Sequence, residues 1–134
     1  MKTKKSTVTK KSNSKSGYAD GFLLVVPTKN IPAYKRMAIL GGKIWMEHGA
    51  LEYKECSGDD LNIKMGVPFQ GLLKSKPGDT IIFSWITYKS RAHRDKVNTK
   101  VMKDPRLSKS MDINNMPFDC NRMSYGGFKV IVSH

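Results

Sequence analysis

Short apolar runs rich in β-branched and aromatic residues recur along the chain, and each one predicts a β-strand. The first run covers residues 18–26 and ends at Pro27, which has no backbone N–H to donate within a sheet. Two further runs cover residues 80–88 and 122–132. Residues 51–57 alternate more weakly, and we predict a fourth strand there, with successive side chains on opposite faces.

Two stretches repeat their apolar residues at steps of three and four, which predicts helices. The first helix should cover residues 31–48, because Pro32 suits a first helical turn and Gly49 favours a helix end. Its apolar stripe contains Gly41 within a glycine pair, which indicates either close approach to a sheet or ligand, or a kink. The complete stripe is Tyr34, Met37, Ala38, Gly41, Ile44, Trp45 and His48.

The second helix should begin after Ser90, a favourable N-cap residue, and end before Pro105, with one more turn to residue 111. Residues 58–78 form a long connection, which predicts either a functional lid or dimer arm, or a hidden short strand near residues 68–73. Residues 114–121 read as a loop. In the last strand, Gly126 and Gly127 predict a bulge or a close backbone approach.

The predicted order is β-α-β-β-α-β, which is typical of a ferredoxin-like α+β sandwich with an antiparallel sheet. Such a sheet carries its helices on one face, and its other face is usually polar. Here both faces are apolar: in the run over residues 80–88, Phe83 and Trp85 alternate with Ile82 and Ile86. We therefore expect a homodimer whose two sheets pack face to face. The alternative is a monomer in which the long connection folds back over the sheet.

Composition separates a basic tail from a single domain. Residues 1–17 hold six lysines and no acidic residue, whereas the rest of the chain holds 18 basic and 11 acidic residues. We predict a disordered tail over residues 1–17 and a folded domain over residues 18–134. The tail could instead be a basic arm that contacts nucleic acid or lipid headgroups.

The distribution of charge and cysteine bears on partners and compartment. Basic residues are dense between residues 89 and 109, which favours either a solvated helix face or an RNA-binding surface, but no motif of stacked aromatics supports RNA. We found neither a membrane-spanning run nor a secretory signal, so we expect a cytoplasmic protein without membrane contact. Cys56 and Cys120 do not make a disulfide framework, and we expect free thiols.

Several sequence blocks, in the same order over residues 18–132, make the chain similar to a known group of proteins. The blocks YADGFLLVVP, WMEHGALEYKEC, FSWITYKSRAHRDKVNTKVMKDPRL and MPFDCNRMSYGGFKVIV resemble the YbaA-like family of small uncharacterised bacterial proteins. The resemblance implies a dimeric α+β barrel and supplies no mechanism. The lysine-rich residues 1–16 depart from the family's usual short beginning.

Two histidines are candidate catalytic groups. His48, on the apolar stripe at the predicted helix end, could be a general base facing a pocket, or a structural histidine near the helix dipole. His93 falls in the first turn of the second helix between Arg91 and Arg94, where amides and guanidinium groups favour a phosphate or carboxylate. The alternative there is an exposed basic turn partly balanced by Asp95.

Five aromatic residues could line a pocket for a small organic molecule: Trp45, Tyr53, Trp85, Tyr88 and Tyr125. The predicted ligand-binding set is Trp45, Trp85, Tyr88, Arg91 and Arg94. Core packing explains the aromatic residues equally well. No metal-ligand spacing, glycine-rich phosphate loop or nucleophile elbow occurs, so we predict no metal and no cofactor. Three hypotheses follow: a dimer that binds and perhaps transforms a small molecule, a nucleic-acid-associated protein, or a dimer without ligand. Whether the protein is an enzyme stays open.

Overall fold

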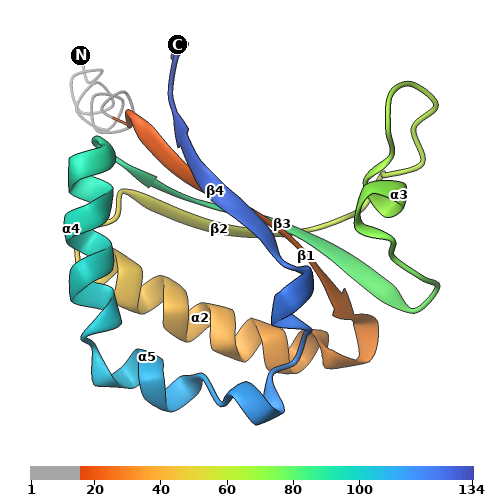
Figure 1. Ribbon diagram of the computed structural model, residues 1–134, viewed down its shortest axis with the longest axis horizontal. Helices are drawn as coiled ribbons and strands as arrows, with labels where there is room; N and C mark the ends of the chain where they lie inside the picture. The colour runs from red at the N-terminus through yellow and green to blue at the C-terminus, as the bar shows by residue number, and fades with distance from the viewer. Residues whose placement is uncertain (1–15) are drawn as a thin grey trace, which may run out of the picture.

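A computed structural model describes residues 16–134, so most of the predicted basic tail lies outside the described residues. The described chain has an α+β fold with strands β1 to β4 and helices on the sheet (Figure 1). In chain order the elements are β1 (Tyr18–Pro27), η1 (Thr28–Asn30), α2 (Ile31–Glu47), β2 (Glu52–Ser57), α3 (Phe69–Leu73), β3 (Asp79–Tyr88), α4 (Arg91–Met102), α5 (Pro105–Ser110), η2 (Ile113–Asn115), η3 (Cys120–Arg122) and β4 (Ser124–Lys129). The predicted positions of the first long helix and of the first three strands are confirmed to within one residue at each end, and α4 ends two residues earlier than predicted.

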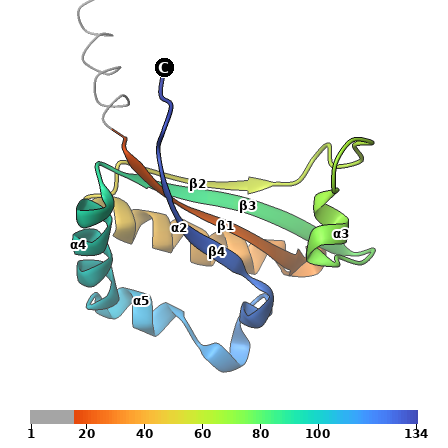
Figure 2. The same cartoon turned by 45° about the horizontal axis from the view of Figure 1, so that its top comes forward.

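The strands form one antiparallel sheet in the order β2-β3-β1-β4. Phe22 of β1 lies opposite Ser84 of β3 on one side and opposite Tyr125 of β4 on the other. Helices α2, α4 and α5 all lie on one side of this sheet, and in both views no helix formed by residues 16–134 covers its other side (Figures 1 and 2). Alternate residues of each strand therefore point either to the helices or to what we call the open face.

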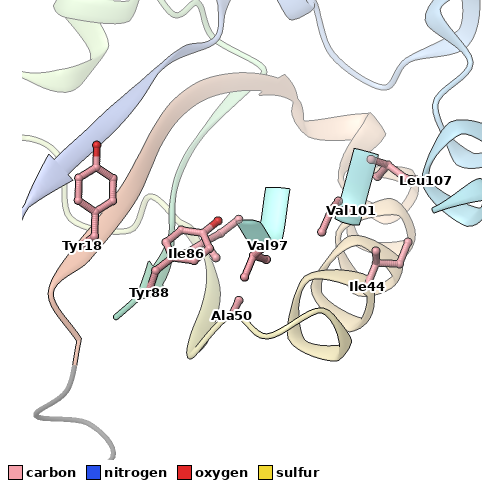
Figure 3. Packing of buried hydrophobic residues seen from close by; sticks show 8 residues of the cluster. All are labelled: Tyr18, Ile44, Ala50, Ile86, Tyr88, Val97, Val101 and Leu107. Atoms are coloured by element: carbon pink, nitrogen blue, oxygen red, sulfur yellow. The ribbon is translucent and has the colours of Figure 1, made fainter. Parts of the chain in front are cut away.

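The main core lies where the α2 and α4 helices meet the sheet. Ile44 of α2, Tyr88 of β3 and Val101 of α4 are fully buried, and Val97 is almost so. The same cluster includes Tyr18, Ala50, Ile86 and Leu107; in Figure 3 Ala50, Ile86, Tyr88 and Val97 lie together, and Tyr18 lies to one side. From α2, Ile44 and Trp45 belong to the predicted stripe, whereas Leu40 packs against this core from outside that stripe.

The open face is apolar and largely uncovered. Phe83 of β3 is 49% exposed and Phe128 of β4 is 64% exposed. The connection between β2 and β3 leaves Phe83 and Phe128 exposed and reaches one end of the sheet, where the Gly58 N–H donates to the carbonyl of the buried Ile81 (2.8 Å). It also accepts hydrogen bonds from Arg122 at its Leu73 and Lys74 carbonyls (2.9 and 3.0 Å). The rest of the connection extends at the end of the sheet away from α4 (Figure 2).

Three local predictions need correction. The short strand suggested near residues 68–73 is the helix α3, because this segment closes its own hydrogen bonds, as between the Leu72 N–H and the Pro68 carbonyl (3.1 Å). Strand β4 is shorter than predicted, because its partner β1 begins at Tyr18, which pairs with Lys129. Gly126 and Gly127 of β4 cause no bulge, since the β1–β4 register is continuous. Gly127 instead allows the close approach of the Tyr18 side chain.

Candidate functional site

A cavity of about 190 Å³ lies between the helix-covered face of the sheet and the elements packed on it. The sheet contributes Phe22 and Ser84, and α2 contributes Tyr34 and Trp45. The remaining wall comes from α5 and the segment that follows it, with Met111, Met116, Phe118, Cys120 and Met123. Aromatic residues and methionines make up nine of the 19 lining residues, which suits an apolar molecule.

A carboxylate held by two tyrosines marks one end of this cavity. The Tyr34 hydroxyl donates to Glu55 Oε1 at 2.7 Å, and the Tyr53 hydroxyl donates to Glu55 Oε2 at 2.8 Å. Burial, followed by the charge of Glu55 and its hydrogen bonds, raises the pKa of both tyrosines well above the usual range. Both hydroxyls therefore stay protonated and continue to donate at physiological pH.

The local sequence explains how these three groups meet. In β2, alternate residues share a face, so Tyr53 and Glu55 both point toward the helices, opposite Ile86 and Ser84 of β3. Gly42 of α2 faces the Tyr53 ring, and a Cβ atom at this position would lie 2.9 Å from the ring carbon Cδ1. The glycine pair of α2 thus permits the close helix–sheet approach that was one of its two predicted explanations.

Ser84 places a buried hydroxyl in the floor of the cavity. The residue is 5% exposed and lies directly opposite Glu55 in the β2–β3 register. Its Oγ atom can both donate and accept a hydrogen bond at the cavity wall, so a polar group of a ligand could bond it.

His48 lies outside the lining of this cavity and joins a charged cluster between α2 and α5. Its Nε2 atom is 2.9 Å from Asp104 Oδ2, and Arg106 Nη2 lies 2.8 Å from the same oxygen. Arg106 also pairs with Glu47 at 2.7 Å. Hydrogen bonds from Arg106 and then from His48 hold the pKa of Asp104 well below its usual range. His48 therefore links the end of α2 to the start of α5.

His93 stabilises the start of α4 through local hydrogen bonds. The ring Nδ1 of His93 accepts a hydrogen bond from the Lys89 backbone N–H at 2.9 Å. The backbone N–H of His93 donates to Ser90 Oγ at 3.1 Å, which confirms Ser90 as the N-cap. Burial, followed by the positive charge of Lys89, lowers the pKa of His93. Arg91 is exposed in the same turn.

Arg94 points away from the start of α4 and toward the sheet. Its Nη1 lies 2.6 Å from Asp20 Oδ1, its Nε lies 2.8 Å from Asp95 Oδ1, and its guanidinium carbon is 5.0 Å from the centre of the Tyr18 ring. Asp20 is buried within β1. The structure therefore does not bring Arg91, His93 and Arg94 together around one ligand position.

Of the five aromatic residues predicted for a pocket, Trp45 and Tyr53 are among the residues that line the cavity. The Trp45 indole N–H donates to Asn98 Oδ1 at 3.1 Å. Tyr88 is fully buried in the core, where its hydroxyl donates to the same Asn98 oxygen at 3.4 Å. Trp85 lies on the open face and donates to Glu52 Oε1 at 3.0 Å.

Sequence reasoning missed Glu55, Ser84 and the methionine-rich wall. The strand alternation did place Tyr53 and Glu55 on one face, yet the contact with Tyr34 depends on how α2 crosses β2. The methionines at positions 111, 116 and 123 are a visible cluster. Their density in a polar loop was the available signal that this segment covers an apolar surface.

Residues 16–134 contain neither a metal-binding group of side chains nor a membrane-spanning helix. No group of three or more histidine, cysteine, aspartate or glutamate side chains is arranged to hold a metal ion in that range. In the same part of the chain, no helix combines the length and apolar character needed to cross a bilayer.

Comparison with known proteins identifies the family. Residues 17–120 match the family described as "Protein of unknown function (DUF1428)". The chain is 38% identical over 115 residues to proteins described as "Uncharacterized protein YbaA" in Escherichia coli strain K12 and in Shigella flexneri, covering 86% of this chain and 97% of theirs. A Burkholderia cenocepacia crystal structure aligns with 87% of this chain and 27% of its own, at 10% identity and a TM-score of 0.31, a likeness too low to support an argument. On the family match and the close relatives together, the chain belongs to the DUF1428 family of YbaA-like proteins.

Proposed function

We propose that this protein binds a small, largely apolar organic molecule in the cavity between its sheet and helices. The observation that carries the proposal is the cavity itself, about 190 Å³ in volume and lined largely by apolar side chains, among them nine aromatic or methionine residues. An apolar cavity of about 150 Å³ is large enough to take up benzene in another protein. A single aromatic ring with a short substituent therefore fits the available volume.

The chemistry of the wall supports uptake of such a molecule. Met111 is 50% exposed and Met116 is half-buried, so both lie where the cavity approaches solvent. Methionine side chains are flexible and polarisable, and they adapt to the shape of an apolar guest. The segment after α5 thus provides a wall that can adjust around a ligand.

A cavity-filling variant tests the proposal. Ala38 lines the cavity from α2, whereas its neighbour Ile39 is 71% exposed and does not. We expect toluene or indole to bind the unchanged protein and Ile39→Phe in NMR titrations, and not to bind Ala38→Phe. Binding to the filled variant with unchanged affinity would place the ligand elsewhere and reject the proposal.

We also propose that the chain is a ferredoxin-like unit that assembles as a homodimer, a dimeric α+β barrel, through the open face. The strand order and antiparallel pairing are those expected of the split β-α-β arrangement. Support for the dimer comes from the exposed Phe83 and Phe128, because a monomer would leave this apolar face in water. The same face in a second copy is the self-complementary cover that two-fold symmetry provides.

Light scattering during gel filtration measures the assembly state directly. We expect twice the mass of the 134-residue chain for the unchanged protein and a monomer for Phe128→Asp. Ile39→Asp is the matched control, since this exposed residue lies on α2, away from the open face. A monomeric unchanged protein would reject the dimer and leave the cavity proposal standing.

A further inference from the structure

We infer that the molecule bound in the cavity is a small amphiphilic amine, whose protonated nitrogen is held by Glu55 and whose apolar body fills the cavity. This inference rests on the proposed function and adds the charge and orientation of the ligand. The observations that carry it are the Glu55 carboxylate held at the cavity by Tyr34 and Tyr53, the position of Ser84 opposite Glu55 in the sheet, and the aromatic side chains of the lining.

Glu55 has the position and the free acceptor capacity for this role. It lines both the cavity and the outer groove between α2 and β2, as do Tyr34 and Tyr53, so the three residues stand at the boundary between the two spaces. Each Glu55 oxygen accepts one tyrosine hydroxyl, at 2.7 and 2.8 Å. A carboxylate offers about four lone-pair positions, so acceptor sites remain for the N–H groups of a ligand. The two tyrosines fix the carboxylate in place before the ligand arrives.

Ser84 offers a second polar group at the same end. The residue is 5% exposed and lines the cavity. A ligand that bonds its hydroxyl has an advantage over a plain hydrocarbon, which would cover the hydroxyl without forming a hydrogen bond to it. Because Ser84 lies directly opposite Glu55, one ligand nitrogen could contact both residues.

The lining of the cavity favours a positive charge over a negative one, because Lys35 and Lys43 line the outer groove and not the cavity. Lys54 is the other charged residue of the lining, but its side chain belongs to the open face, where its Nζ lies 3.9 Å from Glu52 Oε2. Tyr34, Trp45 and Phe22 present aromatic rings, whose negative faces attract cations. A carboxylate ligand would meet Glu55 with like charge, and a neutral alcohol would gain only an ordinary hydrogen bond.

Three probes of nearly equal size and different charge test the inference on the unchanged protein. 2-Phenylethylamine is a cation at neutral pH, 2-phenylethanol is neutral and phenylacetate is an anion. We expect calorimetric titration at pH 7 and low salt to give an affinity for the amine at least about fivefold above that for the alcohol, and weaker binding still for the acid. Equal affinities, or preference for the acid, would overturn the amine inference while leaving the cavity proposal intact. Binding of none of the probes would overturn both.

Substitutions then test which residue is responsible for the preference for the amine. Glu55→Gln keeps the side-chain shape and removes the charge, and we expect it to lower amine affinity roughly tenfold while changing alcohol affinity little. Ser84→Ala should weaken both. Glu52→Gln is the matched control, because Glu52 lies on the same strand but points to the open face, where it accepts from Trp85. Equal loss in the two glutamate variants would overturn the assignment to Glu55. If Glu55→Gln fails to fold, the charge series on the unchanged protein decides.

Discussion

Asp20 of β1 and Arg94 of α4 form an ion pair that ties the helix to the centre of the sheet. The distance from Asp20 Oδ1 to Arg94 Nη1 is 2.6 Å, and the two side chains are 7% and 18% exposed. The residues are separated by 74 positions in the chain. Arg94 had been a candidate for binding an external anion, and here an internal carboxylate takes that position.

The substitution Arg94→Met should destabilise the fold, because it leaves Asp20 charged and buried without its partner. Breaking a buried pair in this way typically costs about 3 kcal/mol or more in the free energy of unfolding, which urea denaturation measures. Asp95→Asn is the control: Asp95 also pairs with Arg94, but its side chain is 60% exposed, and we expect a change below about 1 kcal/mol. Equal losses in the free energy of unfolding for the two substitutions would show that the buried Asp20–Arg94 pair stabilises the fold no more than the exposed pair with Asp95 does.

The two adjacent glycines of β4 should respond differently to alanine. A Cβ atom at Gly127 would collide with the hydroxyl end of Tyr18, whereas a Cβ atom at Gly126 meets nothing within 4 Å. We expect Gly127→Ala to lower the melting temperature, with a loss of about 1–3 kcal/mol. Gly126→Ala should be neutral or slightly stabilising, since alanine restricts the unfolded chain. A neutral Gly127→Ala would mean that Tyr18 moves aside freely.

Two isoleucines of α2 compare a buried position with an exposed one. Ile44 is fully buried between α2 and its neighbours, and Ile39 is 71% exposed. Ile44→Ala should reduce the free energy of unfolding by about 2–5 kcal/mol, because it removes apolar burial and leaves a cavity. Ile39→Ala should change it by less than about 0.5 kcal/mol. Denaturant titration of both variants checks the difference, and similar losses would contradict the position of the core.

Stability should fall with acidity because of His93. Its folded-state pKa is lowered, mainly by burial, below the ordinary value of 6.5. The unfolded chain therefore binds a proton before the folded protein does, so the contribution of neutral His93 is complete above about pH 6.5 and is lost as the pH falls toward the folded-state pKa. The neutral Nδ1 accepts the Lys89 N–H, and protonation would remove that hydrogen bond.

His93→Asn should reduce this pH dependence, because an asparagine oxygen can accept the same backbone N–H without titrating. The slope of unfolding free energy against pH, measured between about pH 7 and 5, should be smaller in this variant than in the unchanged protein. His134→Asn is the control, since His134 is exposed at the end of the chain and its replacement should leave the slope unchanged. An unaltered slope in His93→Asn would assign the dependence to other groups.

The sequence by itself determined the order of the elements and the face that each of them presents. Strand alternation placed Tyr53 and Glu55 together, helical spacing placed Tyr34 and Ile44 on one stripe, and Ser90 marked the start of α4. These features depend on residues only a few positions apart, and local geometry fixes them before any long-range contact forms. For the same reason, the two-sided apolar character of the strands was visible without the fold.

Only the tertiary structure decided which side chains meet. Tyr34 reaches Glu55, and Arg94 reaches Asp20, because of the angle at which helices cross the sheet and the register in which strands pair. The segment after α5 forms a cavity wall and not a plain loop. Its residues Met111, Met116 and Phe118 line the cavity, and Phe118 also packs against the buried cluster that contains Tyr34 of α2 and Leu24 of β1. Contacts of this kind join residues distant along the chain, and the competition among many packings that selects them leaves no periodic signal in the sequence.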